Sequence, residues 1–210
     1  MVPLIRRSLA LVLTLLLTGC GAPEPASRDR FYALESTVPV VAGQPAAGVT
    51  LLVNDLAAYG FLGGRQIVYR TAEEPLEVQR YHQLLWEEPP GRALALELLT
   101  ALRAARLVEL VITPAQRARA DYILGGEITR FEHLPTDRPP RVRAEVNLTL
   151  LRGDDRRSLI SRKYAGDEPT GGDTPQAMVQ AFDRLSGRLV GEVVRDLQLL
   201  RPKLLVGADL

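Results

Sequence analysis

Residues 141–150 read Arg-Val-Arg-Ala-Glu-Val-Asn-Leu-Thr-Leu, so polar and apolar side chains alternate along the whole stretch. Successive side chains of a β-strand point to opposite faces of a sheet, and this period of two therefore predicts a strand with one buried face and one solvent-facing face. Gly153-Asp154-Asp155 then predicts a turn into a partner strand over 159–164. The sequence thus predicts a β-hairpin with one apolar face that needs a covering layer.

Two helices are expected to supply that layer. Residues 92–106 follow Pro89-Pro90-Gly91 and place leucine and alanine on one wide face, which predicts a deeply buried helix. A second, longer helix is expected to begin with Thr174 as its N-cap and Pro175 in its first turn, and to end at Pro202. Its apolar stripe at helical spacing consists of Met178, Ala181, Phe182, Leu185, Leu189, Val193, Leu197 and Leu200.

Further strands are expected between the N-terminus and residue 131. They cover 30–34, 49–53, 66–70, 76–81, 108–112 and 121–131. The turn at 72–75 predicts a hairpin of the third and fourth of these, and the last is expected to bend at Gly125-Gly126. This order of elements predicts a single α/β domain over 29–201, with helices on at least one face of its sheet, and a C-terminal tail over 202–210.

The N-terminus has the three parts of a secretory signal peptide. Arg6-Arg7 precede an apolar run over 9–17, and Thr18-Gly19 follow. The run is too short for a membrane span, which needs about 20 apolar residues. A buried N-terminal helix is the alternative, but the run ends abruptly at Gly-Cys-Gly-Ala-Pro. Residues 1–19 are therefore predicted to be a signal peptide, with a twin-arginine export signal as the less favoured interpretation of the arginine pair.

Leu17-Thr18-Gly19-Cys20 resembles the lipobox of bacterial lipoproteins, in which the cysteine is lipidated and becomes the new N-terminus. Cys20 is the only cysteine of the chain. Residues 20–28 are then a lipidated cysteine and a linker that extends at most about 30 Å, so the folded domain would hang close to its membrane. Gly21 stands where aspartate would suggest retention in the inner membrane of some bacteria, so the outer membrane is favoured.

Composition excludes several classes of function. The chain has 210 residues, 26 lysines and arginines against 25 aspartates and glutamates, one cysteine and two histidines. A net charge of +1 gives no field that favours nucleic acid, and an intramolecular disulfide or a Cys/His zinc cage is excluded. Motifs for a nucleophile, for phosphate binding or for metal ligation do not occur, so we expect no enzyme, no cofactor and no metal.

Charge is distributed unevenly along the chain. Residues 138–163 carry eight basic and three acidic side chains, a net +5, whereas residues 73–97 carry six acidic and two basic ones, a net −4. One interpretation is two solvated surfaces. The other is self-association, in which Arg156 and Arg157 of one copy face Glu87 and Glu88 of the next, and such a head-to-tail contact closes into a ring or runs on as a filament.

Residues 54–65 show neither helical nor strand periodicity. Tyr59, Phe61, Leu62 and Arg65 lie around the turn-forming Gly63-Gly64. One interpretation is a loop whose aromatic side chains bind a partner protein. The other is a loop folded back so that Phe61 and Leu62 fill the edge of the core.

Four segments together resemble one protein family. These are Arg-Phe-Tyr-Ala-Leu at 30–34, Gln-Ile-Val-Tyr-Arg at 66–70, Trp-Glu-Glu-Pro-Pro at 86–90, and 120–132 with Ala-Asp-Tyr-Ile-Leu at its start and Arg-Phe-Glu at its end. They resemble the ABC-type transport auxiliary lipoproteins, which include the third component of the paraquat-inducible envelope system. Relatives often carry Asp-Arg before the second segment, where this chain has Gly63-Gly64-Arg65.

The resemblance implies a mixed sheet covered by helices, similar to the N-terminal domain of the translocation protein TolB. It also implies a non-enzymatic, periplasm-facing accessory subunit that works with an ABC transporter and a periplasmic component of the mammalian-cell-entry (MCE) type, moving lipids between membranes. A lipid or small-solute carrier is the alternative, and it would need an apolar pocket of roughly 300–1,000 Å³. An envelope hydrolase is a third possibility and would need a nucleophile within reach of His82 or His133.

Overall fold

The structure, a computed structural model, describes residues 28–206. The predicted signal peptide, Cys20 and residues 207–210 lie outside the described residues. The elements are β1 (Arg30–Tyr32), β2 (Ala46–Val53), β3 (Ala57–Ala58), η1 (Gly60–Gly63), β4 (Gln66–Tyr69), β5 (Gln79–Trp86), α2 (Pro90–Ala105), β6 (Val108–Ile112), η2 (Pro114–Gln116), β7 (Tyr122–Leu134), β8 (Arg141–Arg152), β9 (Ser158–Pro169), α3 (Pro175–Leu199) and α4 (Arg201–Val206).

Strand β7 is the centre of the sheet. One of its edges pairs antiparallel with β8, which in turn pairs antiparallel with β9. Its other edge pairs in parallel with β2, β3 and β4, one after another along its length. The sheet continues through β6 beside β2, and through β5 and β1 beside β4. The expected single α/β domain with a mixed sheet is thereby confirmed, and the sheet has nine strands.

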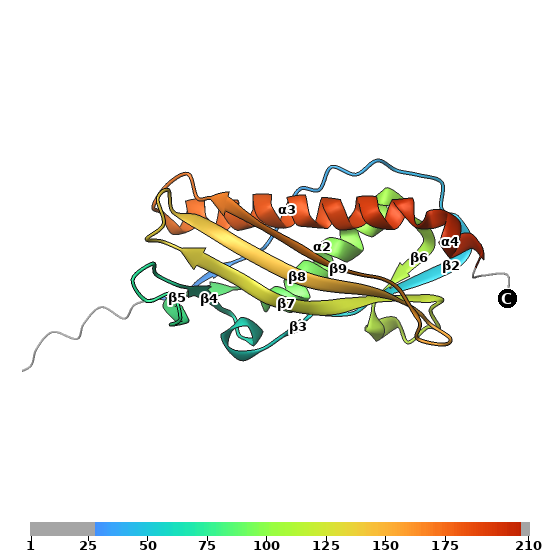
Figure 1. Ribbon diagram of the computed structural model, residues 1–210, viewed down its shortest axis with the longest axis horizontal. Coiled ribbons are helices and arrows are strands. Elements are labelled where there is room, and N and C mark those ends of the chain that lie inside the picture. The colour runs from blue at the N-terminus through green and yellow to red at the C-terminus, as the bar shows by residue number, and fades with distance from the viewer. Residues whose placement is uncertain (1–27, 207–210) are drawn as a thin grey trace, which may run out of the picture.

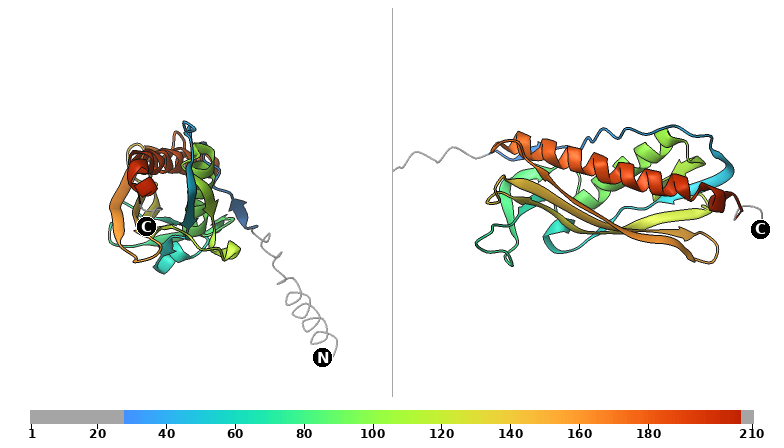
Figure 2. Two further views of the ribbon diagram at one scale, coloured as in Figure 1. Left: turned by 90° about the vertical axis from the view of Figure 1, so that its right-hand side faces the viewer. Right: turned by 45° about the horizontal axis from the view of Figure 1, so that its top comes forward.

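Helices α2 and α3 pack against one side of this curved sheet. Figures 1 and 2 show α3 running along β8 and β9, with α2 beside it on the same side. Burial alternates at every residue from Arg141 to Leu150, as the sequence predicts, because the apolar set of β8 faces the helices. Thr174 caps α3 as expected, and its hydroxyl accepts a hydrogen bond of 3.1 Å from the backbone nitrogen of Ala177.

An aromatic cluster joins the layers at the centre of the core. The rings of Trp86, Phe131 and Phe182 lie 4.5 to 5.5 Å apart between centres. All three side chains are buried. The space between α2, α3 and β8 is filled, since the cavity that Leu94, Leu98 and Leu189 help to line measures only about 10 Å³. The core at this place is therefore too tightly packed to hold a ligand.

Several predicted boundaries differ from the structure. Strand β5 covers Gln79–Trp86 instead of 76–81, because its second half pairs with β1. Strand β9 continues to Pro169, beyond the expected end at 164, because β8 is long enough to pair with all of it. Pro202 does not end the long helix: α3 ends at Leu199, and Pro202 is the second residue of α4, a position where its missing N–H is not needed.

Strand β7 also differs in detail. Its pairing with β8 runs in register through Gly125-Gly126, and the irregularity lies between Ile128 and Arg130. A Cβ at Gly126 would stand 2.0 Å from the carbonyl oxygen of Asn147. The glycine is therefore needed for a close approach of two backbones.

Candidate partner-docking surface

The segment from Asn54 to Arg65 is ordered and divides its side chains between core and solvent. Strand β3 pairs with β7, and the single turn η1 follows it. Tyr59 and Phe61 are 73% and 44% exposed, whereas Leu62 packs against the core. The two interpretations of this segment therefore apply to different residues, since Leu62 fills the edge of the core and the two aromatic rings face outward.

The Arg65 side chain makes contacts within the domain. Its Nε donates a hydrogen bond of 3.0 Å to the carbonyl oxygen of Trp86. Its guanidinium group lies 5.0 Å from the centre of the Phe31 ring. The side chain thus braces η1 against β5 and β1, and the aromatic pair projects beside it. The guanidinium group of Arg80 lies over the ring of Phe61, 4.9 Å from its centre.

A groove of about 400 Å³ lies beside the exposed rings. Phe61, Leu62, Val68 and Val78 form its apolar walls, and Arg70 and Glu132 form its polar end. We call it the η1 groove. It opens between η1, β4, the turn after β4, and β7, on a surface that the helices do not cover.

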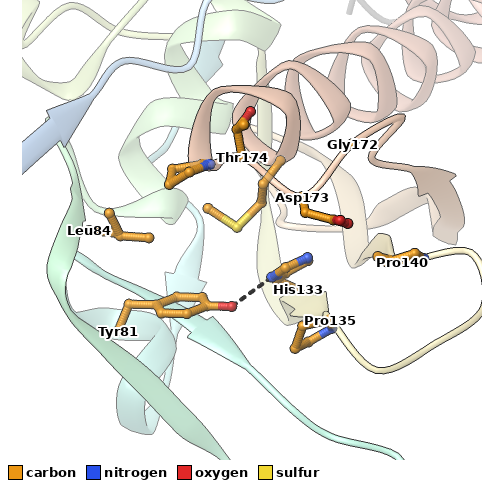
Figure 3. A pocket seen from close by; sticks show the side chains of 10 residues that line it. Tyr81, Leu84, His133, Pro135, Pro140, Gly172, Asp173 and Thr174 are labelled. Atoms are coloured by element: carbon orange, nitrogen blue, oxygen red, sulfur yellow. Dashed lines mark hydrogen bonds between the residues drawn. The ribbon is translucent and has the colours of Figure 1, made fainter.

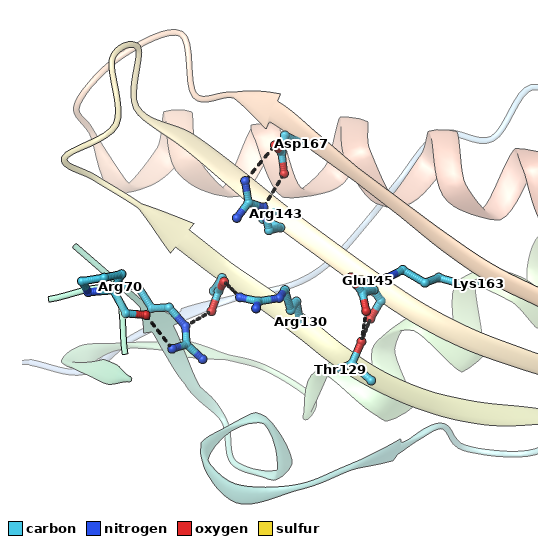
Figure 4. A network of polar contacts seen from close by, with 9 residues as sticks. Arg70, Thr129, Arg130, Arg143, Glu145, Lys163 and Asp167 are labelled. Atoms are coloured by element: carbon cyan, nitrogen blue, oxygen red, sulfur yellow. Dashed lines mark hydrogen bonds and ion pairs between the residues drawn. The ribbon is translucent and has the colours of Figure 1, made fainter. Parts of the chain in front are cut away.

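Glu132, at the polar end of the η1 groove, binds two arginines (Figure 4): Arg70 lines the groove and Arg130 lies beside it. The residue is only 2% exposed, and its carboxylate binds Arg70 Nε at 2.7 Å and an Nη of Arg130 at 2.8 Å. A buried charge is costly unless it is paired, and two guanidinium partners meet that requirement. The parallel register of β4 and β7 places Val68 opposite Glu132. Two of the four family-like segments, Gln66–Arg70 and Arg130–Glu132, therefore meet at this carboxylate.

A second hollow lies at the N-terminal end of α3 (Figure 3). It measures about 270 Å³ and is lined mainly by apolar groups, among them Leu84 and Met178. Tyr81 and His133 supply hydrogen-bonding groups, with the Tyr81 oxygen 2.8 Å from His133 Nδ1. Burial raises the pKa of Tyr81 to about 12 and lowers the pKa of His133 to about 4. Both groups are therefore neutral near pH 7, and a hydrogen bond joins them.

The two histidines do not form a catalytic arrangement within residues 28–206. Tyr81 is the one side-chain hydrogen-bond partner of His133 there, and His82 is exposed on β5 without such a partner. In that same part of the chain, His, Cys, Asp and Glu side chains form no cluster of three that would hold a metal ion. Its helices are too short or too polar to cross a membrane.

The residues considered for self-association lie on exposed parts of the domain. Arg156 and Arg157 belong to the turn between β8 and β9, which Figure 1 shows at the opposite end of the molecule from β4 and β5. Neither arginine has a carboxylate partner among the described residues. Glu87 precedes α2, and Glu88 forms an exposed pair of 3.4 Å with Arg92. The acidic and basic groups thus do not meet within one chain.

Most of the basic region over 138–163 is paired internally. Arg141 and Arg143 both approach Asp167, Arg162 binds Asp196, and Lys163 binds Glu145. Arg152 similarly binds Asp154 in the turn. The net charge counted along the sequence therefore overstates the number of unpaired cations on this surface.

Solved structures show the same fold. Protein XCC0632 from Xanthomonas campestris is 24% identical, with a TM-score of 0.73 over 83% of this chain and 97% of that one. An uncharacterized protein is 17% identical, with a TM-score of 0.61 over 81% and 99% of the two chains. The PelC dodecamer from Paraburkholderia phytofirmans is 14% identical at a TM-score of 0.49 over 78% and 95%, too distant for its assembly to be carried over.

Among curated proteins, none matches the chain. The family model for the ABC-type transport auxiliary lipoprotein component, in contrast, matches residues 32–194. This range contains the aromatic core cluster, the η1 groove and the Arg70–Glu132–Arg130 group, and it bears out the resemblance seen in the sequence. The chain therefore belongs to the ABC-type transport auxiliary lipoprotein family and is an auxiliary lipoprotein component of an ABC-type transport system.

Proposed function

We propose that this protein is a non-enzymatic, periplasm-facing accessory subunit that docks the MCE-type component of a lipid-transporting ABC system. The observation that carries the proposal is the pair of exposed rings, Tyr59 and Phe61, on the rim of the η1 groove. Large aromatic side chains are over-represented among the residues that dominate binding energy at protein interfaces. A rigid body that presents them beside a groove suits docking of a protein partner.

The tightly packed core favours this role over that of a lipid or solute carrier. A carrier needs an apolar interior of roughly 300–1,000 Å³. The cavity between α2, α3 and β8 measures about 10 Å³, and the hollows of about 270 and 400 Å³ open to the surface. We therefore take the transported lipid to pass through the partner components.

Lipidation of Cys20 is the proposed anchor, and the outer membrane is the proposed site. With residues 20–28 as the lipidated cysteine and linker, the domain would stay within about 30 Å of its membrane. Cys20→Ala is expected in the soluble fraction of lysed cells, provided that the signal peptide is processed by other means. Density-gradient separation of the two membranes tests the location of the parent, and retention of Cys20→Ala in salt-washed membranes would refute the anchor.

The docking role is tested with a double variant, Tyr59→Ala with Phe61→Ala. Because both rings are largely outside the core, the melting temperature is expected to stay near that of the parent. Capture of the MCE-type component from solubilised membranes should fall at least about tenfold, which corresponds to about 1.4 kcal/mol. Leu62 is left intact because it packs against the core.

The matched control removes two exposed apolar side chains elsewhere. Leu110 and Leu199 are 55% and 79% exposed, and their double alanine variant should capture the partner as the parent does. Full capture by the Tyr59/Phe61 variant, or an equal loss in the control, would refute the docking role. A large fall in melting temperature would show that the two rings support the fold instead.

A further inference from the structure

We infer that the partner segment recognised at the η1 groove is acidic, with an apolar side chain in the groove and a carboxylate over Arg130. This inference rests on the proposed docking function and adds the chemistry of the partner. It follows from the orientation of Arg70 and Arg130, and from the way in which the neighbouring ion pairs expose their charges.

Arg70 and Arg130 retain donors that the fold does not use. Glu132 accepts one N–H group from each, and an Nη of Arg70 donates to the carbonyl oxygen of Pro75 at 3.1 Å. A guanidinium group has five N–H donors in a fixed fork. The other donors have no hydrogen-bond partner among the described residues, and Arg130, with its side chain 42% exposed, is the more accessible of the two.

Glu132 acts as a positioning residue for these donors. Its own side chain is 3% exposed, and both of its oxygens are engaged by the arginines, so the more exposed groups at this end are the guanidinium groups of Arg70 and Arg130. Side chains that are already held in place lose less conformational freedom on binding. Planar guanidinium donors of this kind suit a carboxylate in a bidentate arrangement.

The adjoining face of the sheet presents cations in the same way. Lys163 is 56% exposed above Glu145, whose side chain is 23% exposed. Figure 4 shows this pair and the Arg143–Asp167 pair on β8 and β9, next to Arg130. In the first pair the cation is the more exposed partner, whereas Arg143 and Asp167 are about equally exposed, so an approaching surface meets the positive charge of Lys163 first. Charge complementarity therefore favours an acidic partner.

The opposite rim of the groove sets the orientation of the partner segment. The turn over residues 71–78 carries three exposed glutamates, Glu73, Glu74 and Glu77. A carboxylate placed over this turn would be repelled. The apolar side chain is therefore expected between Phe61, Val68 and Val78, with the acidic group directed away from the turn and toward Arg130.

A protein segment fits this site better than an anionic lipid surface. The groove has apolar walls and exposed aromatic rings that suit one or two side chains. Arg70 lines the groove and is only 23% exposed, so a flat layer of headgroups would not reach it as easily as a single extended segment would. We therefore infer that a protein segment binds here, and binding of anionic lipid vesicles is measured as the competing result.

The test uses two fluorescein-labelled peptides, acetyl-Leu-Glu-Glu-Leu-Leu-Glu-amide and its counterpart with glutamine at each glutamate. Fluorescence anisotropy is expected to show at least about tenfold tighter binding of the acidic peptide to the parent protein, with the difference shrinking as salt is raised. Arg130→Gln should abolish the preference, and Arg130→Lys should retain part of it. Arg119→Gln, a change at an exposed arginine outside the groove, should leave the preference unchanged.

Equal binding of the two peptides by the parent, or an unchanged preference in Arg130→Gln, would overturn the inference. Binding of phosphatidylglycerol vesicles by the parent but not by Arg130→Gln, without any peptide preference, would also overturn it and assign the site to lipid. Melting temperatures of the arginine variants show whether they are folded.

Partner capture distinguishes the two proposals. If the Tyr59/Phe61 variant loses the MCE-type component while Arg130→Gln captures it as the parent does, docking stands and carboxylate recognition is wrong. If the Tyr59/Phe61 variant captures it normally, the proposed function itself is wrong.

Discussion

His133 couples the stability of the fold to pH. Burial holds its imidazole neutral, with a pKa of about 4 in place of 6.5, and the neutral ring shares a hydrogen bond with the Tyr81 hydroxyl. Between these two pH values the unfolded chain binds more protons at this residue than the folded protein does. The folded state therefore loses stability as pH falls from about 6.5 to about 4, and the loss from this group is then complete.

This residue gives a direct prediction. His133→Gln removes the titrating group but retains an acceptor for the Tyr81 hydroxyl. The parent should lose up to about 3 kcal/mol of unfolding free energy through His133 between pH 7 and pH 4, because each unit of pKa shift corresponds to about 1.4 kcal/mol. Urea unfolding at both pH values should therefore show a smaller decrease for His133→Gln than for the parent.

Exposed His82 provides the control for that measurement. His82→Gln should leave the pH dependence as it is in the parent, because this side chain lies in solvent on β5. An identical pH dependence in the parent and His133→Gln would contradict the buried, neutral state of His133.

At the level of elements, the segment between β1 and β2 acts as a strap across the helices. Figure 2 shows it crossing above α3 and α2. The backbone nitrogen of Glu35 donates to Asp183 at 3.0 Å, and Gln198 donates to the carbonyl oxygen of Val41 at 2.9 Å. Gly43 donates to the carbonyl oxygen of Ala105, also at 2.9 Å. Leu34, Val38 and Val40 also pack against the core, so the strap is held by apolar packing and by hydrogen bonds spaced along its length.

Two glycines of α3 offer a matched pair of tests. A Cβ at Gly187 would lie 3.0 Å from the carbonyl oxygen of Thr37 in the strap, whereas a Cβ at Gly191 would have no neighbour closer than 3.6 Å. Alanine at either position should gain helix propensity of up to about 1 kcal/mol. Gly191→Ala is therefore expected to stabilise the protein, and Gly187→Ala to stabilise it less or not at all because the strap must move.

Thermolysin cleavage distinguishes loosening of the strap from a change in the stability of the whole domain. Gly187→Ala should be cut within residues 33–45 faster than the parent, while Gly191→Ala should be cut at the parent's rate. Equal cleavage and equal unfolding free energies of the two variants would show that the strap does not pack closely on Gly187.

For the whole molecule, the remaining question is association between copies. Since internal pairing uses most of the basic residues over 138–163, the proposed contact depends on Arg156 and Arg157 in the β8–β9 turn and on Glu87 and Glu88 before α2. These groups lie apart in one chain, so they would attract one another only between chains. The contact would be heterologous and would form a ring or a filament.

Charge reversal tests this proposal. The parent is expected to show a mass above that of the monomer by light scattering in detergent, and Arg156→Glu with Arg157→Glu should shift it toward the monomer. Adding Glu87→Lys and Glu88→Lys should restore the larger mass. A parent that is monomeric at high concentration, or a mass unaffected by the reversal, would refute self-association through these groups.

The sequence alone determined the elements whose pattern is local. Polar and apolar residues alternate over Arg141–Leu150, and this pattern predicts which face of β8 is buried. The apolar stripe of α3 does the same for that helix, and Thr174 and Pro175 mark its start. Each of these signals is complete within one element. The same holds for the single α/β domain, which the order of elements already indicates, while the targeting segment over residues 1–19 stays a prediction.

Only the tertiary structure decided which segments meet. Arg70 and Glu132 both stand in family-like segments, and Arg130 and Glu132 alternate as outward residues of a strand would. Neither fact shows that Arg70 and Arg130 both bind the buried carboxylate of Glu132. The Arg70–Glu132 contact depends on the parallel register between β4 and β7, and the two residues are 62 positions apart in the sequence. The ends of β5 and β9 were likewise set by their partner strands. Pairing between distant strands leaves no periodic pattern in the sequence, and the proposed docking surface depends on such pairing.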